Sequence, residues 1–461
     1  MGMATDTDAT RISDDTDRSI LSGARLWITI GACALVLLGA FESLAVTTVM
    51  PVVSADLDGE RLYALAFAGP LATGVIGMVV AGDWSDRRGP AGPLYAAVTA
   101  FVAGLLIAGL APSMEVFVAG RFVQGLGSGA MMVALYVVVA RVYPQAALPA
   151  IFAAFSAAWV VPSLIGPTVA AVVTDLASWQ WVFLGVVALA VVALVMVVPA
   201  LRGMPVSEGT TGRWSFARLG WSMLAAAAVL ALNLVGDIPG IGPVLALAAV
   251  IIALVAVRPL VPRGTLVARR GLPSVILVRG LAAGAFFGTQ VYVPYLLTTD
   301  YALTPTVAGL ALTGGALAWS ITSTVQGRLG DRLAHVTALR IGTALVVVSI
   351  LLVLATASLS WHVLVIAAAW IIGGAGMGLM SPRSSVLTLS MSTPVDQGFN
   401  SAAMTVADSF GSAVVLAVTG TLFAALAATG PFTAVFALTG IIAIAAALLA
   451  PRVVASDKGE Q

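Results

Sequence analysis

The sequence predicts an all-α membrane protein with fourteen transmembrane helices, built as two six-helix bundles with a two-helix insertion between them. Of the 461 residues, 60% are hydrophobic and only 9% are charged, and a soluble core cannot hide so much apolar side chain behind so little polar surface. The apolar residues form runs close to the ~20 residues that a membrane-spanning helix needs. Arginines gather in alternate connections between these runs. The solvent around this chain is therefore predicted to be lipid.

Six apolar segments come first, at residues 27–48, 63–82, 93–111, 115–140, 149–173 and 179–199. They predict an N-terminal six-helix bundle over residues 25–200. Before it, residues 1–24 are rich in aspartate and lack the basic start of a cleaved signal peptide. We expect these residues to form a disordered cytoplasmic tail.

Two shorter segments follow a polar stretch, at residues 219–236 and 241–257, and the turn sequence Gly236-Asp-Ile-Pro-Gly240 joins them. They predict a compact hairpin inserted in a linker over residues 201–273. Six more segments lie at residues 275–297, 306–326, 337–357, 362–382, 399–427 and 431–450. These predict a C-terminal six-helix bundle over residues 274–452, followed by a cytoplasmic tail over residues 453–461.

The positions of the arginines predict the orientation, because Lys and Arg gather in short cytoplasmic loops. With the first segment starting inside, the outer loops hold Arg61 alone and are otherwise acidic. The inner connections hold Arg87, Arg88, Arg141, Arg202, Arg213, Arg218, Arg258, Arg263, Arg269, Arg270, Arg328, Arg332, Arg340 and Arg383. We therefore predict a multi-pass protein of the cell inner membrane with both termini in the cytoplasm.

The composition also argues against several other functions. A formal net charge of +1 gives no basis for a nucleic-acid partner, which needs clustered basic charge. Lys458 is the only lysine, so a phosphate-binding loop of an ATP-driven pump has no candidate in the body of the chain. Cys33 is the only cysteine, and His335 and His362 the only histidines. We expect no catalytic residues, no metal and no cofactor, and the proton motive force as the energy source.

An internal repeat supports a build from two related bundles. The string Gly82-Asp-Trp-Ser-Asp86-Arg87 follows the second segment, and Gly327-Arg-Leu-Gly-Asp331-Arg332 follows the tenth with the same Gly, Asp and Arg spacing. Both strings lie at the predicted cytoplasmic end of the second helix of a bundle. Parallel repeats of this kind are typical of transporters with a substrate site between two halves.

Several strings resemble the signatures of the major facilitator superfamily. Residues 82–89, GDWSDRRG, are similar to its loop signature, with Trp84 at the usual Leu position. GRFVQGLGSG, with Arg121, Gln124, Gly125 and Gly129, is similar to its fourth-span signature. Gly166-Pro167 is similar to the antiporter signature of the fifth span, but Pro162 and Ala170-Ala171 replace its other glycines. The first of these resemblances implies that the loop residues of both repeats act as a conformational latch.

The resemblance extends to the branch of fourteen-span drug:proton antiporters. Phe41-Glu42 with Pro51 at the exit of the first segment, the inserted hairpin, and Trp179-Gln-Trp181 are all similar to that branch. The resemblance implies a proton-coupled transporter and specifies no substrate. For the glycines and proline Gly125, Gly129, Gly166 and Pro167 we expect roles in helix packing or bending.

Glu42 and Arg121 are predicted to meet inside the membrane. Counting 1.5 Å per residue, both lie about 12 to 14 Å below the outer surface. A buried ionisable side chain is costly and is by default a functional hypothesis. We expect Glu42 to titrate during proton coupling while Arg121 pairs with its carboxylate. The alternative is a fixed structural ion pair.

Asp408 lies close to the predicted midplane and has no evident charged partner in the sequence. It is a candidate for a second proton carrier or for a contact with a cationic substrate. The alternative is a protonated carboxyl that is hydrogen-bonded to a nearby serine. Arg279 lies near the inner end of its segment, and we expect it to extend to the headgroups.

The expected function is proton-coupled export of hydrophobic or amphipathic organic compounds, cations included, by a monomer whose partners are a small lipophilic substrate, protons and membrane lipids. Export of lipids or envelope precursors, a proton-independent facilitator, and a non-transporting scaffold remain as alternatives. Side chains that could line the substrate cavity are Phe41, Gln124, Tyr136, Trp159, Phe286, Gln290 and Tyr292.

Overall fold

Fourteen α-helices make up almost all of the part of the chain that the structure, a computed structural model, describes. The described residues are 20, 24–59, 62–202, 215–235, 241–303, 305–426 and 430–454. The predicted tails, at residues 1–24 and 453–461, lie almost wholly outside them. Each of the fourteen helices overlaps one predicted segment, so the prediction of an all-α membrane protein with fourteen helices is confirmed.

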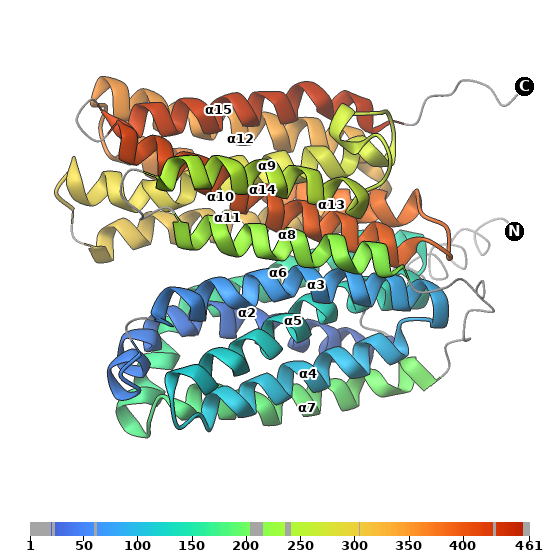
Figure 1. Cartoon of the computed structure of the whole chain (residues 1–461). Helices are drawn as coiled ribbons and strands as arrows, with labels where there is room; N and C mark the ends of the chain where they lie inside the picture. The colour runs from blue at the N-terminus through green and yellow to red at the C-terminus, as the bar shows by residue number, and fades with distance from the viewer. Residues whose placement is uncertain are drawn as a thin grey trace, which may run out of the picture.

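The helices fall into three sets along the chain (Figure 1). The first set is α2 (Ala24–Asp56), α3 (Tyr63–Arg88), α4 (Ala91–Gly109), α5 (Met114–Val142), α6 (Leu148–Leu176) and α7 (Gln180–Arg202). The hairpin is α8 (Phe216–Val235) and α9 (Gly242–Val257). The last set is α10 (Leu272–Thr299), α11 (Pro305–Leu329), α12 (His335–Leu359), α13 (Leu364–Ser390), α14 (Gln397–Ala425) and α15 (Pro431–Leu449).

Eleven of the described helices are long and apolar enough to cross a membrane, and the hairpin contributes two shorter apolar helices. The chain is therefore a multi-pass membrane protein. Short 3-10 turns lie in the connections, among them η5 (Gly330–Arg332) after α11 and η6 (Ala450–Val453) at the end of α15.

Two hydrophobic clusters correspond to two halves, which Figure 1 shows as a lower and an upper group of helices. The N-terminal half is α2–α7, whose side chains form the larger cluster. The C-terminal half is α10–α15, whose side chains form the second. The larger cluster also takes in Val386 and Leu389 of α13 and Ala402 of α14. The halves therefore share a packed contact where α13 ends and α14 begins.

That contact lies at the end of the molecule at which α3, α5 and α11 finish and α12 begins. We call it the arginine-rich end, because Arg87, Arg88, Arg141 and Arg328 lie on the last turns of these helices and Arg340 lies on the second turn of α12. It is the right-hand end in Figure 1. The backbone N–H of Gly271, just before α10, donates to the carbonyl of Arg452 in η6 at 2.9 Å, which ties the two ends of the C-terminal half together here.

Several of the described helices continue through prolines. α2 continues through Pro51 to Asp56, α6 passes Pro162 and Pro167 without a break, and α13 continues through Pro382 to Ser390. Proline removes one helical hydrogen bond, but neighbouring helices and side chains can satisfy the freed carbonyl inside a membrane protein. The predicted end of α13 at residue 382 is therefore wrong. As a result Arg383 lies inside a helix and is fully buried, where we expected a loop residue.

Glycines allow the closest helix contacts. A Cβ on Gly125 or Gly129 of α5 would overlap the backbone of α3 at Pro70 or Gly74. A Cβ on Gly374 of α13 would overlap the backbone of α11 at Gly315. Small residues at such positions are typical of helix packing in membranes. Gly166 is different, because an added Cβ would only come within 3.7 Å of the Phe41 ring.

Candidate functional site

The structure brings Glu42 and Arg121 together. They lie on α2 and α5, and Arg121 Nη1 donates to Glu42 Oε1 in an ion pair whose two side chains are only 5% and 9% exposed. Arg121 Nη1 also donates to Gln124 Oε1 at 2.6 Å, and its Nε donates to the carbonyl of Ala66 on α3 at 3.2 Å. The guanidinium therefore connects three helices of the N-terminal half.

The surroundings make this pair sensitive to the state of the carboxyl. Burying two charges costs several kcal/mol per ion, and the pairing offsets that cost only while both charges persist. Gln124 holds its amide oxygen against Arg121, and its Nε2 has no hydrogen-bond partner among the described residues. A proton on Glu42 would remove one charge, while Arg121 would keep its contacts with Ala66 and Gln124. The protonation state of Glu42 would therefore change how well the charge of Arg121 is paired.

Asp408 has a charged partner after all. Arg279 Nε donates to Asp408 Oδ1 at 2.7 Å and to Oδ2 at 2.9 Å, and Arg279 Nη2 lies 2.7 Å from Oδ2. The Nη1 of the same arginine donates to the carbonyl of Ser381 on α13 at 2.6 Å. The expectation of an unpaired Asp408 is therefore wrong, and so is the expectation that Arg279 extends to the headgroups, because its side chain is only 11% exposed.

The sequence contained one usable signal for this second pair. α10 and α14 both begin at the arginine-rich end. Arg279 and Asp408 lie seven and eleven residues after the first residues of these helices, which corresponds to about 10 and 16 Å of depth. A long arginine side chain spans that difference. Estimating the depth of Arg279 and Asp408 in the same way as for Glu42 and Arg121 would have suggested the contact between α10 and α14.

An aromatic group of the N-terminal half lies against α14. The Tyr136 ring on α5 packs edge-on to Phe152 with 5.0 Å between ring centroids and stacks on Phe155 at 6.2 Å. Tyr136 also packs against a hydrophobic cluster that contains Met404 and Phe410 of α14. Tyr136 therefore joins the aromatic rings of α5 and α6 to the side chains of α14.

The other predicted cavity residues fall into different places. Phe286 stacks on Trp370 at 4.7 Å, and Tyr292 stacks on Phe423 at 5.1 Å, both in the cluster of the C-terminal half. Gln290 is half-buried on the same helix, α10. Phe41 is half-buried on α2, and Trp159 on α6 is 42% exposed. Their role as a shared substrate surface stays a prediction.

The first repeat string joins the two halves at the arginine-rich end. Asp86 on α3 accepts hydrogen bonds from the backbone N–H groups of Gly398 at 2.5 Å and Phe399 at 2.8 Å, in the first turn of α14. A Cβ on Gly82 would lie 2.6 Å from the carbonyl oxygen of Gly398. Arg87 pairs with Asp83 on the same helix at 3.0 Å. The carboxylate of Asp86 is stabilised by the positive end of the α14 dipole.

The second repeat string lies at the matching contact on the other side of the molecule. A Cβ on Gly327 of α11 would come within 3.0 to 3.4 Å of Pro149, Ala150 and Ala153 of α6. Arg332 is exposed in η5. The side chain of Asp331 lies outside the described part of the structure. Each repeat therefore places its glycine where one half contacts the other.

Arg383 is a candidate site residue that sequence reasoning missed. Its guanidinium donates to Gln326 Oε1 at 2.6 Å and to the carbonyls of Gln326 and Gly330, each at 2.8 Å, and it contacts His335 Nδ1 at 3.2 Å. Arg383 thus caps the end of α11 beside the second repeat string. Arg141, near the end of α5, approaches the carbonyl of Ser85 at 3.5 Å beside the first string. In each half, an arginine of the fourth helix therefore contacts the backbone of the repeat string.

The comparisons with known proteins concern almost the whole chain. Residues 31–274 and 275–461 match the family model described as Major Facilitator Superfamily. The multidrug efflux pump SdrM of Staphylococcus aureus (strain N315) is 22% identical over 407 residues, which cover 86% of this chain and 90% of SdrM. The probable multidrug-efflux transporter Rv1634 of Mycobacterium tuberculosis (strain ATCC 25618 / H37Rv) is 26% identical over 397 residues, which cover 81% of this chain and 83% of Rv1634.

Other matches are more partial or concern the fold alone. The MFS efflux transporter aclA of Aspergillus oryzae is 30% identical over 201 residues, so the match spans 43% of this chain and only 36% of aclA. The human organic anion transporter MFSD10 superposes with a TM-score of 0.69 at 14% identity, over 92% of this chain and all of MFSD10. A bacterial homologue of the iron transporter ferroportin gives 0.68 at 12% identity, over 92% and 98%.

Proposed function

Because the chain belongs to the Major Facilitator Superfamily, we propose that it exports hydrophobic or amphipathic organic compounds, cations included, in exchange for protons. The observation that carries this proposal is the buried ion pair of Glu42 with Arg121, which places a titratable carboxyl inside the N-terminal half. The pair of Asp408 with Arg279 supports it with a carboxyl in the C-terminal half. Two relatives that match this chain along most of their length are named as multidrug efflux proteins, and these names support a drug-like substrate.

In this proposal, proton exchange follows because Arg121 and a proton compete for the Glu42 carboxylate. While Glu42 is ionised, the Arg121 guanidinium neutralises its charge. Entry of water or of a substrate, or a change in spacing as the halves move, changes the desolvation and pairing of the carboxyl. The carboxyl then binds a proton in one conformational state and releases it in the other. Alternating access links that exchange to substrate movement in the opposite direction.

The proposed substrate class is supported by the side chains at the contact between the halves and by the exposure of Asp408. The contact between the halves carries aromatic and aliphatic side chains, such as Tyr136, Phe155 and Phe410. Apolar pockets with a few polar groups are typical of drug-sized ligands. A sugar would need many more amide and hydroxyl partners. A lipophilic cation can approach the Asp408 carboxylate, which is 25% exposed.

Proton release from purified protein in detergent tests this function. A lipophilic cation such as tetraphenylphosphonium is added at a series of pH values, and the wild type is compared with Glu42→Gln and Asp408→Asn. We expect the cation to displace protons from the wild type, and one of the two variants to lose that release while still binding the cation. Glu115→Gln is the matched control, because Glu115 is an exposed carboxyl in the first turn of α5.

Two outcomes would contradict the proposal. If the wild type and both variants bind the cation but none of them releases protons, the protein is a proton-independent facilitator. Failure of the lipophilic cation to bind, together with binding of a phospholipid or an envelope precursor, would indicate lipid export. Thermal unfolding of each variant in the same detergent separates a loss of coupling from a loss of fold.

A further inference from the structure

The inserted hairpin packs along the seam between the two halves. A third hydrophobic cluster combines side chains of α3, α8, α9, α10 and α14, so it includes both halves and the hairpin. Its members include Val75 and Val79 of α3, Val229 of α8, and Met404 and Phe410 of α14. In Figure 1 both hairpin helices lie next to α14, and α8 lies beside α3. The hairpin therefore packs against both halves and is part of the contact between them.

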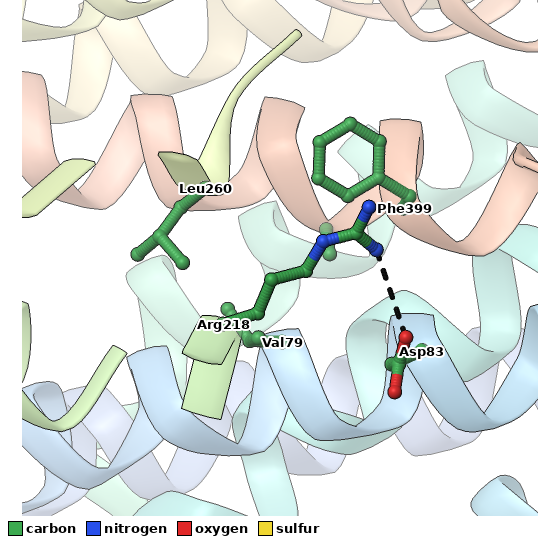
Figure 2. A pocket seen from close by; sticks show the side chains of 6 residues that line it. Val79, Asp83, Arg218, Leu260 and Phe399 are labelled. Carbon is green, nitrogen blue, oxygen red and sulfur yellow. Dashed lines mark ion pairs between the residues drawn. The ribbon is translucent and has the colours of Figure 1, made fainter. Parts of the chain in front are cut away.

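One side chain of the hairpin reaches both halves at the arginine-rich end. Arg218, in the first turn of α8, places Nη1 3.6 Å from Asp83 Oδ1 of α3. Its guanidinium carbon lies 4.3 Å from the centre of the Phe399 ring of α14, within the range of a cation–π contact. Figure 2 shows the guanidinium between the carboxylate and the ring. The backbone N–H of Ser215 also points to Asp83 Oδ2 at 3.5 Å.

Phe399 is held from two sides. Its backbone N–H donates to Asp86 of α3, and its ring lies under Arg218 of α8. Arg218, Phe399 and Asp83 line a small cavity with Val79, Leu260 and Ala402, so the contact is partly enclosed. The first turn of α14 is thus bound by its backbone to the N-terminal half and by its side chain to the hairpin.

We propose that Arg218 makes the hairpin a clamp that holds the arginine-rich end closed. α8 packs mainly on α3, so the Arg218–Asp83 pair stays with the N-terminal half when the halves separate, and Asp83 orients the guanidinium. The contact with Phe399 is different, because it crosses to α14 and is lost on opening. Only an interaction that differs between two states shifts their equilibrium. Arg218 is therefore a positioning residue of the closed state, acting through the Phe399 ring.

Distance measurements between spin labels test the clamp without a substrate or a proton gradient. In a Cys33→Ser background, labels are attached at Gln145→Cys and Arg340→Cys, which are exposed residues in different halves at the arginine-rich end. The protein is placed in lipid nanodiscs, and the populations of short and long distances give the ratio of open to closed molecules. Because neither transport nor proton binding is needed, the result does not depend on the proposed function.

We expect Arg218→Gln and Phe399→Leu each to raise the ratio of open to closed molecules about two- to fivefold, the size of one partly exposed cation–π contact. The double variant should raise it no further than either single variant, because both remove the same contact. Arg218→Lys should raise the ratio of open to closed molecules less than Arg218→Gln does, since lysine keeps the charge but loses the planar stacking on the ring. Arg258→Gln, which removes an exposed arginine next to α9, is the control and should leave the ratio unchanged.

Unchanged distance distributions in both Arg218→Gln and Phe399→Leu would overturn the clamp. Additive effects in the double variant would also overturn it, because they would mean that the two side chains act separately. Arg218 is 38% exposed, so its replacement should leave the fold intact. Thermal unfolding of each variant verifies this before the distances are compared.

Discussion

At the scale of single residues, the Glu42–Arg121 and Asp408–Arg279 ion pairs differ in how many partners support the arginine. Arg121 contacts Glu42, Gln124 and the Ala66 carbonyl, so its charge has three acceptors. Arg279 has the Asp408 carboxylate and the carbonyl of Ser381. In each pair the carboxyl and the arginine belong to different helices of one half. A change of protonation therefore acts first on helix contacts within that half.

Removing Arg121 should destabilise the protein more than neutralising Glu42. Arg121→Met removes the cation together with its contacts to Gln124 and the Ala66 carbonyl, and breaking a buried pair in this way costs about 3 to 5 kcal/mol. Glu42→Gln keeps an oxygen that accepts from Arg121 and should cost less. Thermal unfolding in detergent measures both. Adding Glu42→Gln to Arg121→Met should recover part of the loss, and a double variant less stable than Arg121→Met alone would contradict this reasoning.

Asp408 and Arg279 should be strongly coupled in stability. Asp408→Asn and Arg279→Met each remove one partner of a pair with three short N–O contacts. A double-mutant cycle on unfolding free energies should therefore give an interaction of about 1 to 3 kcal/mol. Asp83→Asn combined with Arg279→Met serves as the control cycle, because Asp83 lies on α3 and pairs with Arg87 and Arg218. Additive effects in the first cycle would mean that the pair contributes little.

At the scale of helices, Gly82 sets how closely α3 and α14 approach. Gly82→Leu should push the first turn of α14 away, because even a Cβ would lie 2.6 Å from the Gly398 carbonyl. We expect the variant to favour the open arginine-rich end, seen as a longer distance between labels at Gln145 and Arg340. Gly185→Leu on α7 is the matched control, since a Cβ there meets no atom within 4 Å. An unchanged distance in Gly82→Leu would show that this contact does not limit closure.

The sequence predicted the helices well and their ends less well. Apolar runs located all fourteen helices of the described residues, because a membrane-spanning helix needs about 20 mostly apolar residues. Pro382 suggested an end that α13 does not have, and this hid the buried position of Arg383. The similar depths of Glu42 and Arg121 in the membrane predict their contact. The contact of Arg279 with Asp408 is harder to predict, because no local sequence pattern distinguishes a paired arginine from one that extends to the headgroups.

At the scale of the whole molecule, the distribution of arginines predicts which side faces the cytoplasm. Cysteine accessibility in oriented membrane vesicles tests this prediction. In the Cys33→Ser background, Arg340→Cys should react with a membrane-impermeant maleimide only from the cytoplasmic side. Asp300→Cys, in the exposed connection after α10 at the opposite end, should react only from the other side. The reverse pattern would invert the topology, and labelling of both positions from one side would contradict the helix count.

The ion pairs of Glu42 with Arg121 and of Asp408 with Arg279 have an electrical consequence for the whole protein. Moving one elementary charge across a membrane potential of 100 mV involves about 2.3 kcal/mol. Glu42 and Asp408 are each neutralised by an arginine in the same half, so these pairs contribute no net charge that the field could move when the ionised protein rocks between states. A bound proton gives its pair a net positive charge. Under the proposed exchange of protons for substrate, the membrane voltage would therefore act on these two pairs mainly in the proton-loaded conformations. It would bias the proton-loaded step of the cycle and leave the contribution of the pairs to the return step nearly voltage-independent.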